Sequence, residues 1–388
     1  MTRFLILLIL YIFWSCSGEK KDSGLRHIDL AANLNVRVDS TLTWNDLASS
    51  MEVIPLETTD SSLLSTFRIV NVTGNRIIGL NRVENRNSDG WIMLSGVKSD
   101  VRIFDMKGKF IRTIDRKGRG NQEYPDLITL QSGDDPLCIK VGNDKDIYTY
   151  DEYGKFIRQD TLPRHFFRMA YAGKGRFIIE NSSYPWTDYN YCLSLMDENG
   201  KVEKELLPVL RDSSCRVNMV LTMSGYLAST AGGVLYKSPY CDTLYLVTPD
   251  AEALPFCVYG MGEYSGDRLL GAATGGDAEK LDKILDETIL ISNATFTGDK
   301  WFLKYSLGDK CYSEVWEKDA ECPLVRRTGP FDQSGLAFKF PEGGTLNIWP
   351  QLIKDGNAYF IVEGYRAAGL VKGISEESNP VLIVARLK

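Results

Sequence analysis

Short apolar stretches that alternate with polar residues occur along most of the chain, and turn-forming residues separate them. In the segments 101–112, 147–158 and 193–202 the alternation has a period of two, which places every second side chain on one face of a strand. Each segment carries Asp-x-x-Gly-Lys at the same place, between one apolar strand and the next. A polar turn with glycine between two alternating strands predicts a β-hairpin. The pattern therefore predicts three similar hairpins.

The turn residues of these hairpins have structural roles in this prediction. The first turn position is an aspartate in each copy: Asp105, Asp151 and Asp197. An aspartate there accepts hydrogen bonds from backbone N–H groups that follow it. Three residues later each copy has a glycine: Gly108, Gly154 and Gly200. A type I turn with a bulge needs positive φ at that position, which glycine adopts without strain.

The three aspartates follow one another at intervals of 46 residues. A repeat of this length, built from strands and turns, is typical of a β-propeller. We therefore predict an all-β fold, a six-bladed β-propeller of four-stranded antiparallel blades. The blades are expected at residues 67–114, 127–161, 166–207, 220–259, 291–327 and 348–387. The spacing becomes irregular after the third blade, so seven blades remain an alternative.

Two further segments belong to this prediction. Residues 51–56 have the pattern of an edge strand, and we expect them to complete the last blade, because such closure removes two sheet edges. Residues 266–290 interrupt the strand pattern. Within them, Leu281, Ile284 and Leu285 are spaced as on one face of a helix, which predicts a short helical insertion.

The N-terminus predicts export. A basic residue and a run of about ten apolar residues make residues 1–15 a secretory signal peptide, since a membrane span needs ~20 apolar residues. The position of Cys16 after a small residue resembles a bacterial lipoprotein signal, which implies cleavage before Cys16 and acylation of it. We expect residues 16–50 to form a lipid-anchored tether and N-terminal segment, and residues 51–388 the propeller. An ordinary secreted protein with unmodified Cys16 is the alternative.

Charge and cysteine usage narrow the classes of partner and cofactor. The formal net charge is −6 and lysine and arginine do not cluster, which argues against a nucleic-acid partner. No Cys-x-x-Cys occurs, which argues against a structural zinc site. Cys241 and Cys257 flank one predicted turn, and we favour two free thiols over a disulfide there. We expect a monomer.

The segment Gly118-Arg-Gly-Asn-Gln-Glu-Tyr124 resembles the Gly-x-Gly-Pro-Gly-Glu-Tyr/Phe element of NHL-like propellers, with Asn-Gln in place of Pro-Gly. Together with the signal peptide, Val-Ile-Pro-Leu-Glu at 53–57 and Asn-Pro-Val-Leu at 379–382, it makes the mature chain resemble the six-bladed β-propeller lipoproteins of the Bacteroidetes type. The resemblance implies a propeller on an outer membrane lipoprotein and leaves the periplasmic or surface face open. It carries over no catalytic residue.

The sequence contains no catalytic motif. Gly-x-Ser-x-Gly, His-Glu-x-x-His and Gly-x-x-x-x-Gly-Lys are all absent, and the mature chain has two histidines, His27 and His165. His165 is the one candidate for a catalytic imidazole, and a loop or core residue is the favoured interpretation. We predict no catalytic residue, no metal ligand and no cofactor.

Aromatic residues gather in the segment 183–191, which joins two predicted strands of the third blade. The candidate ligand contacts are Tyr184, Trp186, Asp188, Tyr189 and Tyr191. Aromatic faces beside acid and amide groups suit glycan stacking and protein interfaces, and they equally suit packing between blades. We therefore predict a binding or scaffolding domain for a glycan, a peptide or an envelope protein. The alternative is a lyase or hydrolase acting on a carbohydrate at the channel mouth.

Overall fold

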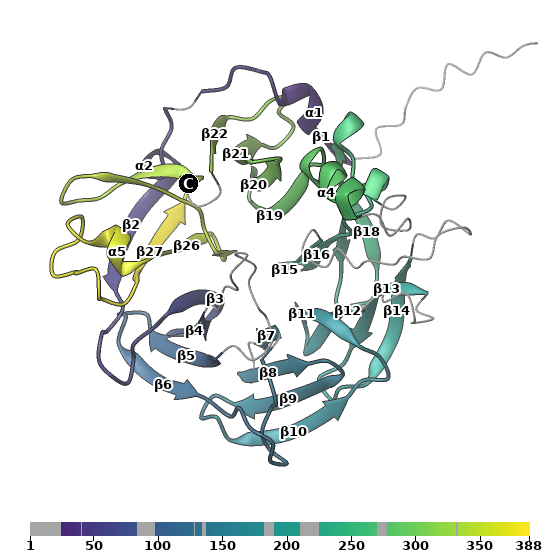
Figure 1. Ribbon diagram of the computed structural model, residues 1–388, viewed down its shortest axis with the longest axis vertical. Helices are drawn as coiled ribbons and strands as arrows, with labels where there is room; N and C mark the ends of the chain where they lie inside the picture. Colours follow the sequence, from purple (N-terminus) through teal and green to yellow (C-terminus); the bar gives the residue numbers. More distant parts are fainter. Residues whose placement is uncertain are drawn as a thin grey trace, which may run out of the picture.

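The computed structural model is a ring of six β-sheets arranged as blades around a central axis (Figure 1). It describes residues 25–39, 41–83, 98–127, 129–133, 137–181, 190–209, 225–269, 278–330 and 333–388. The predicted six-bladed β-propeller is confirmed, and the seven-bladed alternative is wrong. No helix within these ranges is long and apolar enough to cross a membrane.

Blades 1 to 5 share one topology, in which four antiparallel strands follow one another from the centre outward. Blade 1 comprises β3 (Thr66–Thr73), β4 (Arg76–Arg82), β5 (Ser99–Asp105) and β6 (Phe110–Ile114). Blade 2 comprises β7 (Thr129–Ser132), β8 (Cys138–Asn143), β9 (Asp146–Asp151) and β10 (Phe156–Thr161). Blade 3 comprises β11 (Phe166–Gly173), β12 (Arg176–Asn181), β13 (Tyr191–Met196) and β14 (Val202–Pro208).

The later blades keep this order although their repeats have diverged in sequence. Blade 4 comprises β15 (Tyr226–Thr230), β16 (Gly233–Lys237), β17 (Thr243–Val247) and β18 (Ala253–Gly260). Blade 5 comprises β19 (Leu290–Thr297), β20 (Lys300–Leu307), β21 (Lys310–Glu317) and β22 (Val325–Gly329). Blade 6 comprises β25 (Leu352–Lys354), β26 (Asn357–Val362), β27 (Val381–Leu387) and β2 (Ala48–Pro55).

The ring is closed by a strand from the N-terminal part of the chain. β2 is the outermost strand of blade 6 and runs antiparallel to β27, with Met51 opposite Ala385 and Ile54 opposite Leu382. The predicted closing strand at 51–56 is therefore confirmed, and it begins three residues earlier. Pro55 lies on the outer edge of the sheet, where its missing N–H costs no ladder hydrogen bond.

The chain before β2 runs along the outside of blades 4, 5 and 6 (Figure 1). β1 (Arg26–Asp29) adds to blade 4 as a fifth strand parallel to β18, and α1 (Leu30–Asn33) follows it. Arg326 of blade 5 donates to the carbonyl of Asn33 at 2.7 Å. In α2 (Trp44–Leu47), Trp44 is fully buried and its Nε1 donates to the carbonyl of Ile348. The sequence pattern predicts neither β1 nor the two short helices.

The repeated hairpins have the predicted turns. The carboxylate of Asp105 accepts hydrogen bonds from the N–H groups of Lys107 and Lys109 at 2.8 and 2.9 Å, and Asp151 and Asp197 do the same in their own turns. The glycines have positive φ of 79°, 75° and 81° at positions 108, 154 and 200. A Cβ on the first of these glycines would lie 2.2 Å from the carbonyl oxygen of Pro55. The turn of blade 1 therefore packs against the closing strand of blade 6.

The helical insertion is confirmed as α4 (Ala278–Asp286), whose Leu281 is buried while Ile284 and Leu285 pack beside it. Other short elements lie outside the four strands of each blade. They are the hairpin of β23 (Leu336–Lys339) and β24 (Thr345–Ile348), the 3₁₀ turn η1 (Gly262–Tyr264) and α5 (Gly364–Ala367). Cys241 and Cys257 are free thiols, as favoured from the sequence.

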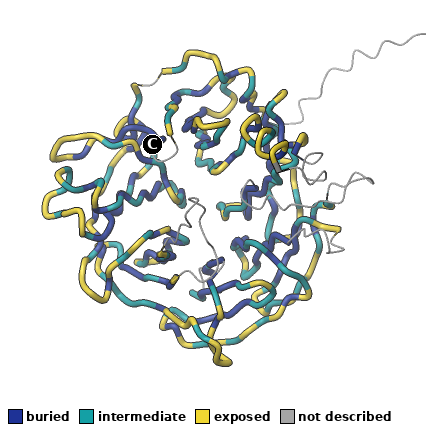
Figure 2. Tube along the Cα trace, in the orientation of Figure 1, coloured by how far each residue is buried: buried dark blue, intermediate teal, exposed yellow. Residues whose placement is uncertain are grey.

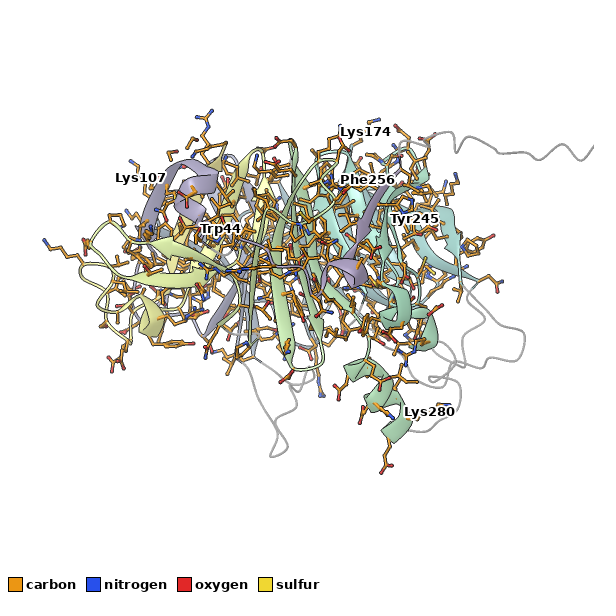
Figure 3. All side chains as sticks on the ribbon, turned by 90° about the horizontal axis from the view of Figure 1, so that it is seen from above. Trp44, Lys107, Lys174, Tyr245, Phe256 and Lys280 are labelled. Atoms are coloured by element: carbon orange, nitrogen blue, oxygen red, sulfur yellow. The ribbon has the colours of Figure 1, made fainter. Side chains whose placement is uncertain are left out.

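The ring has two distinct faces. In the side view of Figure 3, Lys107 and Lys174 lie at one face and Lys280 of α4 lies at the opposite one. We name the first the turn face, because it carries the turns between the first and second strands of the blades, and the second the helix face. Buried residues are concentrated in the strands and exposed residues in the connections (Figure 2).

Candidate functional site

The innermost strands of the six blades surround a central cavity of about 700 Å³. All six strands contribute to its lining, from β3 in blade 1 to β25 in blade 6. The glycines of three first turns, Gly74, Gly298 and Gly356, are among the lining residues, so the cavity lies at the turn-face end of the channel. Its size is that of a small-molecule or single-sugar site.

The wall of this cavity is polar and hydrogen-bonded across blades. Nζ of Lys354 in blade 6 donates to Oδ1 of Asn71 in blade 1 at 3.0 Å. Nδ2 of Asn71 then donates to Oγ of Ser132 in blade 2 at 2.8 Å. Asn71 and Ser132 are both buried, so the bond between them is shielded from water, and the two bonds together link three inner strands.

The cavity has few ionisable groups among the residues that the structure describes. Of the described lining residues, Asp355 is the one carboxylate and Lys354 the one amine. Burial raises the pKa of Tyr359, and the charge of Asp355 adds to this effect. Carbohydrate hydrolases of the usual kind need two acidic side chains. Within the described residues, no group of three His, Cys, Asp or Glu side chains is placed to hold a metal ion.

Toward the helix face, arginines occupy equivalent places in blades 1 and 3. Arg68 is the third residue of β3 and lies opposite Leu80, whereas Arg168 is the third residue of β11 and lies opposite Glu180. Nε of Arg168 donates to Glu180 at 2.5 Å and Nη1 donates to the carbonyl of Gly225 at 2.8 Å. Burial acts to lower the pKa of Arg168, but the carboxylate of Glu180 outweighs it and the pKa is raised.

The predicted contact residues are placed only in part. Cys16 and four candidate contacts, Tyr184, Trp186, Asp188 and Tyr189, lie outside the described residues. Tyr191, the fifth, is the exposed first residue of β13, and its carbonyl accepts a hydrogen bond from Nδ2 of Asn181.

Tyr191 lies at the helix-face end of blade 3, because β12 runs toward that face and Asn181 is its last residue. His165, at the junction of blades 2 and 3, contacts the carboxylate of Asp144. It is a loop residue, as favoured from the sequence. The two arginines were missed, although a repeated Phe-Arg pair at 67–68 and 167–168 marks them.

A family model described as "Domain of unknown function (DUF4934)" matches residues 25–386. The chain belongs to this family. The match includes β1 and the segment outside blades 4 to 6, so the family unit extends beyond the repeats themselves. No curated protein has a significantly similar sequence.

Solved structures similar to this family member match it over most of its length. A Bacteroides fragilis protein described as a "putative exported protein" is 16% identical with a TM-score of 0.65, over 94% of this chain and 99% of that one. The PQQ-bound aldose sugar dehydrogenase of Streptomyces coelicolor is 12% identical with a TM-score of 0.39, over 87% and 99%. The Pan2 WD40 domain of Neurospora crassa is 10% identical with a TM-score of 0.40, over 83% and 90%. The first of these shows a shared fold, and the other two carry no argument about this chain.

Proposed function

We propose that this chain is an exported cell-envelope protein whose propeller binds a ligand in its central cavity. The observation that carries the proposal is the polar cavity of about 700 Å³ to which all six inner strands contribute. A cavity of this kind, with few charges and many hydrogen-bonding groups, suits recognition of a glycan or of the end of a peptide. One carboxylate among the described lining residues supports binding over carboxylate-driven catalysis.

The location is part of the same proposal. Residues 1–16 have the features of a lipoprotein signal, and a similar fold occurs in a protein described as exported. The resemblance to NHL-like lipoproteins of the Bacteroidetes type agrees with this. Acylated Cys16 would hold the propeller on the outer membrane, and several acyl chains are needed for firm anchoring. Conversion of Cys16 to serine should move the protein from the membrane to the soluble fraction of the native host; unchanged membrane retention would reject the anchor.

A variant with a bulky side chain in the cavity tests whether the cavity binds the ligand. Ser229 is exposed and lines the cavity at the turn-face end of β15, so Ser229→Trp places a large ring in its entrance. Thr328→Trp on the outermost strand of blade 5 is the matched control, because it adds the same ring at an exposed position outside the cavity. Full-length protein is screened on arrays of envelope glycans and of peptides.

The proposal predicts that at least one array component binds the wild type and Thr328→Trp but not Ser229→Trp. Equal binding by all three proteins, or no binding to any component, would reject the cavity as the site. Trp186→Ala supplies a separate test of the aromatic segment. It should weaken capture of the same component while the melting temperature stays nearly unchanged.

A further inference from the structure

The equivalent arginines of blades 1 and 3 face different residues on the neighbouring strand. The side chain of Arg168 is neutralised within its own blade, because Glu180 lies directly opposite it on β12. In blade 1 the residue opposite Arg68 is Leu80, which belongs to the apolar core. Directly opposite residues of an antiparallel pair have Cβ atoms only about 5 Å apart, so this exchange decides whether the arginine has a counter-charge.

Arg68 has no hydrogen-bond or ion-pair partner among the residues that the structure describes. Its neighbours in sequence, Phe67 and Ile69, are buried in the cluster that joins blade 1 to blade 6. Side chains alternate along a strand, so Arg68 lies on the other side of the sheet, which is the side of Leu80. Arg68 is an exposed residue, and it lies on the innermost strand of its blade, beside the channel.

The charge of Arg68 lies among other positive charges. Burial lowers the pKa of Arg68, and the nearby charges of Arg82 and Arg168 lower it further. Blade 2 separates blade 1 from blade 3, so the influence of Arg168 acts across the channel. Surrounding protein thus removes much of the bulk water around this charge, although the residue as a whole is exposed.

The backbone on both sides of Arg68 is held in place. The side-chain amide of Gln351 accepts a hydrogen bond from the N–H of Ile69 at 2.8 Å and donates one to the carbonyl of Phe67 at 3.3 Å. On the other edge of the strand, β4 pairs with Arg68 through Leu80. A site with a fixed backbone loses less entropy when it binds a ligand.

We propose that the channel binds the oxyanion of its ligand, a carboxylate or a phosphate or sulfate group, through the guanidinium of Arg68. A guanidinium presents paired N–H donors that match such oxyanions. Arg68 lies two residues before Val70, the first cavity-lining residue of β3, which is a distance of about 7 Å along the strand. An acidic ligand can therefore fill the polar cavity while its anionic group contacts Arg68.

This inference rests on the proposed function and names the chemistry of the ligand. It is tested by calorimetric titration of the full-length protein with glucuronate, with inorganic phosphate and with glucose as the neutral control. The wild type should bind glucuronate or phosphate but not glucose, and the preferred anion identifies the carboxylate or the phosphate source. Arg68→Gln should weaken binding about tenfold or more, as expected for loss of a charge-assisted hydrogen bond.

Two further variants test whether the unpaired positive charge of Arg68 is what binds the anion. Leu80→Glu places a carboxylate opposite Arg68, as Glu180 lies opposite Arg168 in blade 3. The new carboxylate should pair with Arg68 and so weaken anion binding, although Arg68 is retained. Lys107→Gln removes one positive charge from an exposed turn far from the channel and should bind as the wild type does. Melting temperatures establish that each variant is folded.

The outcomes distinguish this inference from the proposed function. If Ser229→Trp abolishes binding of an anion and Arg68→Gln leaves it unchanged, the role of Arg68 is rejected. The cavity would then remain the binding site. The role of Arg68 is also rejected if the folded wild type binds neither anion at millimolar concentration. This holds even if the arrays identify a neutral ligand for the cavity. Loss of binding in both Arg68→Gln and Leu80→Glu, with Lys107→Gln unaffected, supports it.

Discussion

Asn379 donates its side-chain amide to the carbonyl of Glu57 at 2.7 Å, a contact between residues 322 positions apart. The same amide donates to the carbonyl of Ser62 at 2.9 Å, and its oxygen accepts from the N–H of Leu64 at 2.8 Å. Asn379 is 1% exposed. One side chain before the last strand thus satisfies three backbone groups that follow the closing strand, and it fixes the N-terminal part of the ring to the C-terminal part.

Asn379→Leu should lower the free energy of unfolding by about 3 kcal/mol, because it leaves these buried backbone groups without partners. Urea denaturation measures the change. Asn199→Ala, at an exposed turn position, is the control and should alter stability by less than about 0.5 kcal/mol. Similar losses of unfolding free energy in both variants would show that the hydrogen bonds of Asn379 do not stabilise the closure of the ring.

Gly108 combines positive φ with a close approach to the closing strand, whereas Gly298 has a φ of 56° with no atom within 4 Å of its Cβ position. Gly298→Ala should therefore cost about 1 kcal/mol for backbone strain alone. Gly108→Ala should cost at least about 2 kcal/mol more, since its Cβ meets the backbone of Pro55. Thermal and urea unfolding of the two variants test the difference, and equal losses would contradict the packing role.

The repeat period made the fold predictable, because turn chemistry and strand alternation are local properties of the sequence. The three Asp-x-x-Gly-Lys turns identify the first three blades, and the later blades follow by spacing. β1 could not be predicted in this way, since a four-residue parallel strand depends on the edge of β18, which is far away in sequence. The same holds for Arg68. Its unpaired charge depends on Leu80 lying opposite it, which becomes visible only when the register of the two strands is known.

The two equivalent arginines should respond differently to the same substitution. Arg168→Gln leaves Glu180, a largely buried carboxylate, without its cation, and should lower stability by about 2 kcal/mol. Arg68→Gln removes a charge that has no ion-pair partner among the described residues and lies near the charges of Arg82 and Arg168, so it should leave stability unchanged or slightly higher. Urea unfolding at low and high salt compares them. A large loss of stability in Arg68→Gln would mean that this residue holds the fold together.

Lys237 gives the stability a specific pH dependence. It is 2% exposed, and burial lowers its pKa from 10.5 to about 8. Between pH 8 and 10.5 the unfolded chain binds this proton and the folded chain does not, so the contribution of Lys237 to stability rises with pH. From pH 7.5 to 9.5 the rise is about 2 kcal/mol.

Lys237→Met isolates this contribution, because thiols and tyrosines titrate equally in both proteins. The difference in unfolding free energy between wild type and Lys237→Met should shift in favour of the wild type by about 2 kcal/mol from pH 7.5 to 9.5. A difference that stays constant with pH would show that Lys237 keeps an ordinary pKa in the folded protein.

The most direct test of the central claim is the position of a bound anion. Crystals of the full-length protein soaked in selenate, a sulfate analogue, can be measured at the selenium absorption edge. An anomalous peak in the channel about 3 Å from the guanidinium nitrogens of Arg68, absent from crystals of Leu80→Glu, is the predicted result. Selenate peaks confined to the outer surface, with the channel empty beside Arg68, would contradict it.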